Sequence, residues 1–156
     1  KAPPVRPLFY PKSSKYRADR EKAEWAALCS QFTAMLNGAG ACLFGAMIGV
    51  QRYPIFEWLN AATGWNKTPD EYLQLGWNIQ TLRQAFNQKQ KAPLAAEIND
   101  RPLGRPPQPV GANKGRSLPI DELKRLYWQE MGWDPASGAP PVAEVERFFE
   151  PSALKS

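Results

Sequence analysis

Thr68-Pro69-Asp70-Glu71 opens the stretch of sequence, residues 68–86, that decides the fold. Thr68 can accept a hydrogen bond from the backbone N–H of Glu71 while the Glu71 side chain reaches back to Thr68, which is a capping box. Pro69 takes the first helical position, where its missing N–H costs nothing. The pattern that follows predicts a helix to about Phe86. Its inward face is expected to hold Tyr72, Leu75, Gly76, Ile79, Leu82 and Phe86.

Four further helices are predicted on either side of this stretch. Asp19 can cap a helix that runs to about Met35, and apolar residues recur in it at steps of three and four. The others are expected over 54–62, where Gly64 ends the helix, over 119–132 and over 142–149. No segment alternates with the period of a strand. The sequence therefore predicts an all-α, multihelical fold.

Proline-rich stretches divide the chain. We expect an extended entry over 1–18, one helical domain over 19–150 and a tail over 151–156, with a long connector at 92–116 that follows a surface. The sequence starts at Lys1 without the apolar region of a signal peptide, and we expect it to begin inside a longer reading frame. No apolar run is long enough to cross a membrane, and we expect a cytoplasmic location.

Composition excludes several classes of function. The net charge is +5, but acidic residues interleave with the cations and no recognition motif is present, so we expect no nucleic-acid partner. Histidine is absent, which removes the commonest general base and metal ligand. Cys29 and Cys42 are the only cysteines, too few for a self-contained zinc or iron–sulfur site. We identify no catalytic residue.

The chemical signal is concentrated in Asn37-Gly38-Ala39-Gly40-Ala41-Cys42. Small residues let a ligand approach the backbone, and consecutive exposed N–H groups attract anions. Asn37 adds a polar side chain, and Cys42 adds a soft metal ligand. The alternative is structural: the turn ends a helix, and Cys42 is a small buried residue. Cys29 falls at helical spacing among apolar residues and is expected in the core. The tryptophans at 58, 65, 77 and 133 are expected to pack helices together.

Five segments, in order, resemble the C-terminal part of the tungsten-containing aldehyde ferredoxin oxidoreductase family. Residues 36–44 look like its D-x-x-G-L-C segment, and residues 59–65 are similar to its N-A-x-T-G-W segment. Residues 82–87 resemble L-x-R-x-F-N, Lys114-Gly115 is similar to part of a G-P-x-K-G connector, and residues 126–134 look like Y-Y-x-x-R-G-W-D. The resemblance runs from about residue 24 to residue 149.

This resemblance implies a helical C-terminal domain of an enzyme that oxidises aldehydes at a tungsten or molybdenum bis-pterin. Cys42 falls on one ligand of a [4Fe–4S] cluster that passes electrons to ferredoxin. The other three ligands are expected in upstream domains of the same enzyme, so that this chain alone is inert and holds no cofactor. Asn37 falls on a pterin-binding Asp, and Gly40, Ala41 and Cys42 are expected to supply nearby backbone contacts.

The sequence departs from the family pattern at two positions of this turn. Asn37 stands in place of Asp, which removes a negative charge, and Ala41 stands in place of Leu, which reduces packing area. The substrate, the metal and the oligomeric state stay open at this point. Two alternatives also stay open: a non-enzymatic helical scaffold or binding module, and a family member that reduces an aromatic acyl thioester.

Overall fold

The expected capping box is present in the computed structural model, which describes residues 17–48, 53–93 and 97–149. Helix α4, Pro69–Lys89, begins after Thr68, whose hydroxyl accepts a hydrogen bond from the Glu71 N–H at 3.3 Å. The Thr68 N–H donates in return to the Glu71 carboxylate at 2.7 Å. These hydrogen bonds from the Thr68 backbone and side chain hold the pKa of Glu71 below its ordinary value.

We expect Thr68→Ala to lower the free energy of unfolding by about 1 kcal/mol, the usual cost of removing a hydroxyl N-cap. The substitution removes the acceptor for the Glu71 N–H and leaves the backbone bond in the other direction. Urea unfolding at neutral pH, followed by circular dichroism, measures the difference. An unfolding midpoint equal to that of the wild type would show that the box contributes nothing to stability.

The other predicted helices are also present. Helix α1 spans Arg20–Gly38, with Asp19 accepting from the Lys22 N–H at 2.9 Å, and α3 spans Ile55–Thr63 and ends at Gly64. Helix α6 spans Ile120–Glu130 and α7 spans Val142–Arg147. The sequence did not predict two short helices, α2 at Leu43–Ile48 and α5 at Asp100–Leu103. Within the described ranges there is no strand, only an isolated bridge between Gln108 and Lys114, so the all-α prediction is confirmed.

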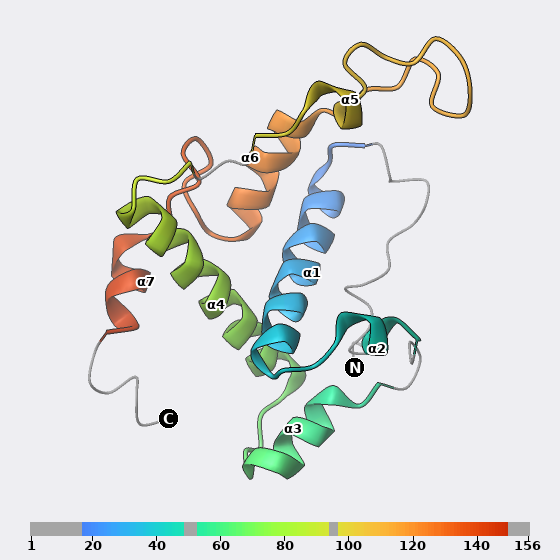
Figure 1. Ribbon diagram of the computed structural model, residues 1–156. Coiled ribbons are helices and arrows are strands. Elements are labelled where there is room, and N and C mark those ends of the chain that lie inside the picture. Colours follow the sequence, from blue (N-terminus) through green and yellow to red (C-terminus); the bar gives the residue numbers. More distant parts are fainter. Residues whose placement is uncertain (1–16, 49–52, 94–96, 150–156) are drawn as a thin grey trace.

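Helices α1 and α4 form the centre of the fold, and they approach closely where Gly76 meets Gln31 (Figure 1). A Cβ atom at position 76 would overlap the backbone carbonyl of Gln31, so only glycine fits this contact. Gln80, one turn further along α4, donates from its side chain to the Ser30 hydroxyl at 3.0 Å. The crossing therefore depends on one small residue and is fixed by a hydrogen bond beside it.

The main core lies where the C-terminal end of α1 meets α2, α3 and the start of α4. Phe56 stacks on Tyr72 with ring centroids 5.4 Å apart, and Phe32 meets Phe56 edge-on. The buried members of this cluster are Phe32, Met35, Leu36, Ala46, Ile55, Phe56 and Tyr72. Because α2 contributes Ala46, this short helix is tied to the core.

A second, smaller core joins α1 and α4 to the end of α6. Met131 and Trp133 pack there against Ala27. The indole of Trp77 donates to the Met131 carbonyl at 2.9 Å, and that of Trp133 donates to the hydroxyl of Thr81 at 3.2 Å. Thr81 is fully buried, and this bond satisfies it. The predictions that Trp77 and Trp133 pack helices together are confirmed.

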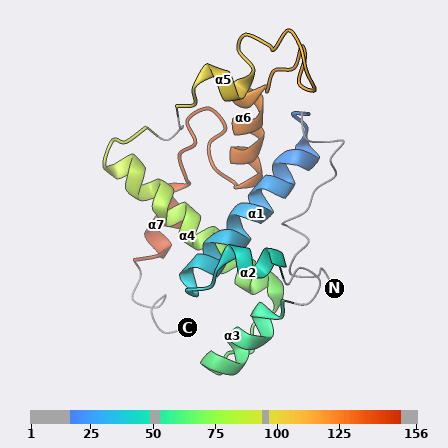
Figure 2. The same cartoon turned by 45° about the vertical axis from the view of Figure 1, so that its right-hand side comes forward.

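The expected inward face of α4 is only partly correct. Tyr72 and Gly76 are buried, but Leu82 and Phe86 are 42% and 61% exposed. The reason is geometric, because α4 diverges from α1 toward its C-terminal end (Figures 1 and 2). The expectation for the other two tryptophans is also wrong: Trp58 and Trp65 lie at the surface, where each meets a tyrosine ring.

The predicted ends of the chain and the membrane prediction have different outcomes. Most of the predicted entry, residues 1–16, and the predicted tail lie outside the described residues, which leaves both as predictions. In the part of the chain that the structure describes, no helix combines the length and the apolar character that a membrane span requires.

Candidate functional site: the turn between α1 and α2

The turn that follows α1 has the geometry of a Schellman helix end. Gly40 has φ +72°, the left-handed conformation that favours glycine, and its N–H donates to the Asn37 carbonyl at 3.0 Å. The Ala41 N–H donates to the Leu36 carbonyl at 3.0 Å. Ala41 is half-buried against the main core, which supplies the apolar contact that accompanies this motif.

These hydrogen bonds correct one expectation. One of the two interpretations of the sequence was that exposed backbone N–H groups attract an anion, but those of Ala39, Gly40 and Ala41 donate to carbonyls of α1. These N–H groups are hydrogen-bonded within the helix end, because the last carbonyls of a helix need donors. An anion facing the turn therefore does not meet free N–H groups at these three positions.

Cys42 is an exposed residue of the turn whose backbone is held by a hydrogen bond. Its carbonyl accepts from the N–H of Ala46 at 3.2 Å, which places Cys42 immediately before α2. Its neighbour Ala41 and its hydrogen-bond partner Ala46 both contact the main core. The thiol itself is exposed and forms no disulfide. The fold thus anchors the backbone on both sides of Cys42 and presents the sulfur outward, so the alternative of a buried packing cysteine is wrong.

Cys29 differs from Cys42 in each of these respects. It lies inside α1 and is half-buried, and burial raises the pKa of its thiol, partly offset by the positive charge of Lys22. A thiol with a raised pKa is a poor thiolate ligand. Cys29 is therefore a packing residue, as the sequence suggested.

An apolar groove of about 390 Å³ lies beside the turn. The end of α1 forms one wall with Met35, Gly38 and Ala39. Helices α3 and α4 and the segment between them provide the other lining residues, among them Leu59, Trp65 and Ile79. Phe44, two residues after Cys42, is 72% exposed. Exposed apolar surface therefore lies both at Phe44, close to Cys42 in the sequence, and beside the end of α1.

Two of the other family-like segments have structural roles. The Asn60 side chain donates to the Lys67 carbonyl at 2.9 Å and accepts from the Lys67 N–H and from the Tyr72 hydroxyl, which closes the α3–α4 loop. At the end of α6, Asp134 accepts from the Ser137 N–H and hydroxyl, and these bonds lower its pKa. Both segments position helices and carry no reactive group.

The described residues contain no group of three or more side chains that could hold a metal ion. Four ligands usually hold an iron–sulfur cluster, and this chain has two cysteines, of which Cys29 is half-buried within α1. The fold and the site therefore define a helical domain that presents a single cysteine from a glycine turn and can supply one ligand to a shared centre.

The chain belongs to the aldehyde ferredoxin oxidoreductase family. Residues 2–148 match the model of this family described as domains 2 and 3. The chain is 33% identical over 129 residues to a tungsten-containing aldehyde ferredoxin oxidoreductase of Pyrococcus abyssi, which covers 81% of this chain and 21% of the relative. The chain is also 31% identical over 144 residues to the protein of the same name from Pyrococcus furiosus, and this match covers 90% of the chain and 23% of that relative. The chain spans about a fifth of the length of these relatives, and no solved structure matches it significantly.

Proposed function

We propose that this chain works as a helical domain of a tungsten- or molybdenum-dependent aldehyde oxidoreductase, in which Cys42 is one of four ligands of a [4Fe–4S] cluster. The observation that carries the proposal is the exposed thiol of Cys42 on a turn whose backbone is anchored on both sides. A cluster ligand needs both properties, because the sulfur must reach the iron and its position must not drift. The other three ligands come from polypeptide outside this sequence.

The surface around Cys42 supports a site shared with other domains of the same enzyme. Phe44 and the groove beside Gly38 and Ala39 are exposed and apolar, as expected of a face that other domains cover. Cys29 is unsuited to join Cys42 at one cluster, because it is half-buried within α1. Docking of the other domains on this face both covers the apolar surface and brings the remaining cysteines to Cys42.

The turn 37–42 is proposed to face the pterin of the tungsten or molybdenum cofactor, which supplies the two-electron chemistry of aldehyde oxidation when it is bound. Asn37 is exposed at the end of α1 and offers a carboxamide that both donates and accepts. Gly40 and Ala41 would contact the pterin through their carbonyls and the small Ala41 methyl group, since their N–H groups are engaged. Cys42 would hold one iron of the cluster through its sulfur, and the cluster would supply the electron-transfer chemistry toward ferredoxin.

The partial site leads to a test on the chain by itself. We expect the purified 156-residue chain to contain no stoichiometric iron or tungsten and to show no aldehyde-dependent reduction of a viologen dye. The same chain within the intact enzyme is expected to contain both metals and to show this activity. Metal analysis by mass spectrometry and a dye-reduction assay measure the two properties. A metal-replete, active isolated chain would contradict the shared site.

A further inference from the structure

The connector between α4 and α6 contains an ordered loop that the functional proposal does not use. It follows α5, and the Leu118 N–H donates back to the Leu103 carbonyl at 2.8 Å. A second closure joins the Gly115 N–H to the Gln108 carbonyl at 2.9 Å. Gly104 lies so close to the Arg116 carbonyl that a Cβ atom would overlap it. Backbone contacts therefore hold the two ends of this loop together.

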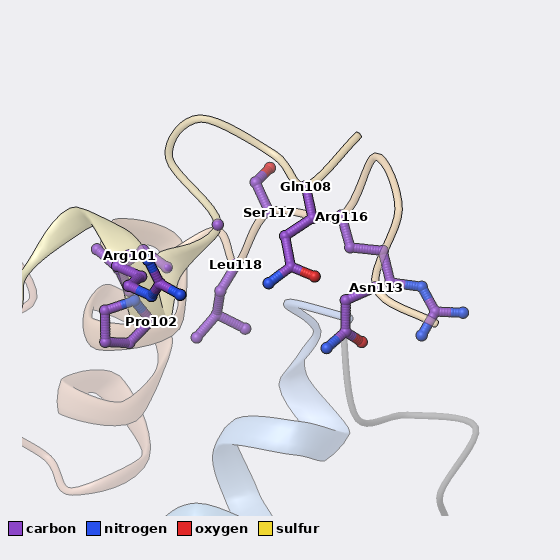
Figure 3. Close-up of a pocket in the computed structure, with 9 residues that line it drawn as sticks. Arg101, Pro102, Gln108, Asn113, Arg116, Ser117 and Leu118 are labelled. Atoms are coloured by element: carbon purple, nitrogen blue, oxygen red, sulfur yellow. The ribbon is translucent and has the colours of Figure 1, made fainter. Parts of the chain in front are cut away.

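A pocket of about 270 Å³ lies between α5 and the loop (Figure 3). Its polar lining consists of two arginines and three neutral hydrogen-bonding side chains, and none of its lining residues is acidic: Arg101, Gln108, Asn113, Arg116 and Ser117. The side chains of Arg101 and Gln108 extend from opposite sides toward the space above Leu118, while the Arg116 guanidinium points to the other end, beside Asn113 (Figure 3). Two donor groups thus converge over an apolar floor.

The donors that converge in the pocket are unused within the described part of the chain. The side chains of Arg101 and Gln108 make no hydrogen bond or ion pair there. The segment 101–118 contains four cations and no acidic residue, and Asp100 directly precedes it. Asp121, on α6, approaches Arg105 at 3.7 Å but already pairs with Lys124 at 2.9 Å. Cations therefore outnumber acidic residues by four to two over residues 100–121.

We propose that this pocket binds the oxyanion of a small molecule, a phosphate or carboxylate group held by Arg101 and Gln108. The guanidinium of arginine offers two parallel N–H groups that match two oxygens of such an anion. Gln108 adds an amide N–H. The volume suits a small molecule rather than a macromolecule. The pocket is separate from the turn 37–42, because the two lie near opposite ends of α1 (Figures 1 and 2). This helix has 19 residues and is about 28 Å long.

Isothermal titration calorimetry of the full chain with sodium phosphate and with sodium citrate tests this proposal, at ionic strength fixed with sodium chloride. We expect saturable binding of one anion per chain, and the tighter anion identifies the preferred oxyanion. Arg101→Gln is expected to weaken binding at least about tenfold, the loss for one charge-assisted bidentate contact. Gln108→Leu is expected to weaken it by a smaller factor. Arg83→Gln, on the exposed surface of α4, makes the same change in net charge and is expected to leave affinity unchanged.

Three outcomes would overturn the proposal. The first is no saturable binding of either anion. The second is an equal loss of affinity in Arg83→Gln and Arg101→Gln, which would show a diffuse response to net charge. The third is binding of a single-stranded oligonucleotide through Arg101 far more tightly than of phosphate or citrate, which would assign the surface to a macromolecule.

Discussion

Replacement of Cys42 by alanine is expected to abolish the iron–sulfur EPR signal of the reduced intact enzyme. The substitution removes one of four thiolate ligands from a site that has no substitute nearby, since Cys29 is half-buried in α1. Loss of even an outer-shell partner commonly costs 10–100-fold in metal affinity or activity, so loss of a ligand is expected to cost at least about 100-fold in aldehyde-dependent dye reduction. The backbone of the turn should be unaffected, because the hydrogen bonds that fix it do not involve the thiol.

Cys29→Ala is the matched control for this experiment. It removes the other thiol and leaves the turn intact, so we expect an unchanged EPR spectrum and an unchanged iron content. Circular dichroism of both variants confirms that each remains folded. An EPR spectrum of Cys42→Ala identical to that of the wild type would show that Cys42 is not a ligand.

Gly76→Val is expected to destabilise the fold strongly. A Cβ atom at position 76 would overlap the Gln31 carbonyl, and that atom is backbone, so α1 and α4 must move apart. Forcing extra atoms into a packed contact costs about 1–3 kcal/mol, and we expect about 2 kcal/mol for Gly76→Ala and 3 kcal/mol or more for Gly76→Val. The better helix propensity of alanine offsets only about 1 kcal/mol.

Gly45→Ala supplies the comparison for the Gly76 variants. Gly45 also lies in a helix, α2, but the nearest atom to an added Cβ is the Tyr53 hydroxyl at 4.0 Å. We therefore expect this variant to be as stable as the wild type or slightly more stable. Urea unfolding curves with equal slopes for all variants allow the free energies to be compared. Equal stability of Gly76→Ala and Gly45→Ala would show that the helix crossing tolerates a side chain at position 76.

Local signals predicted the fold well where a single residue determines the geometry. The capping box at Thr68 and the helix ends at Gly40 and Gly64 follow from hydrogen bonding and φ angles, which neighbouring residues decide. Burial at the C-terminal end of α4 could not be predicted in this way. Periodicity shows which face of a helix is apolar, but not where the partner helix diverges, and Phe86 is exposed for this reason.

The candidate site shows a similar division. The sequence indicated the turn and Cys42, because small residues and a soft ligand follow a helix directly. It left open whether the N–H groups of Gly40 and Ala41 are free or complete the end of α1, since a free turn and a helix end require the same glycines. Helix α2 was missed because six residues with an internal glycine give too short a periodic signal, yet its Ala46 helps to fix Cys42.

The central claim is that the Cys42 sulfur is bonded to an iron atom of a shared cluster. Its most direct test is a crystal structure of the intact enzyme, with anomalous scattering data at the iron edge to locate the cluster irons. We expect Cys42 to be bonded through Sγ to one iron, with the other three ligands contributed by polypeptide outside this sequence. A cluster with four other ligands, and Cys42 beyond bonding distance of every iron, would contradict the account.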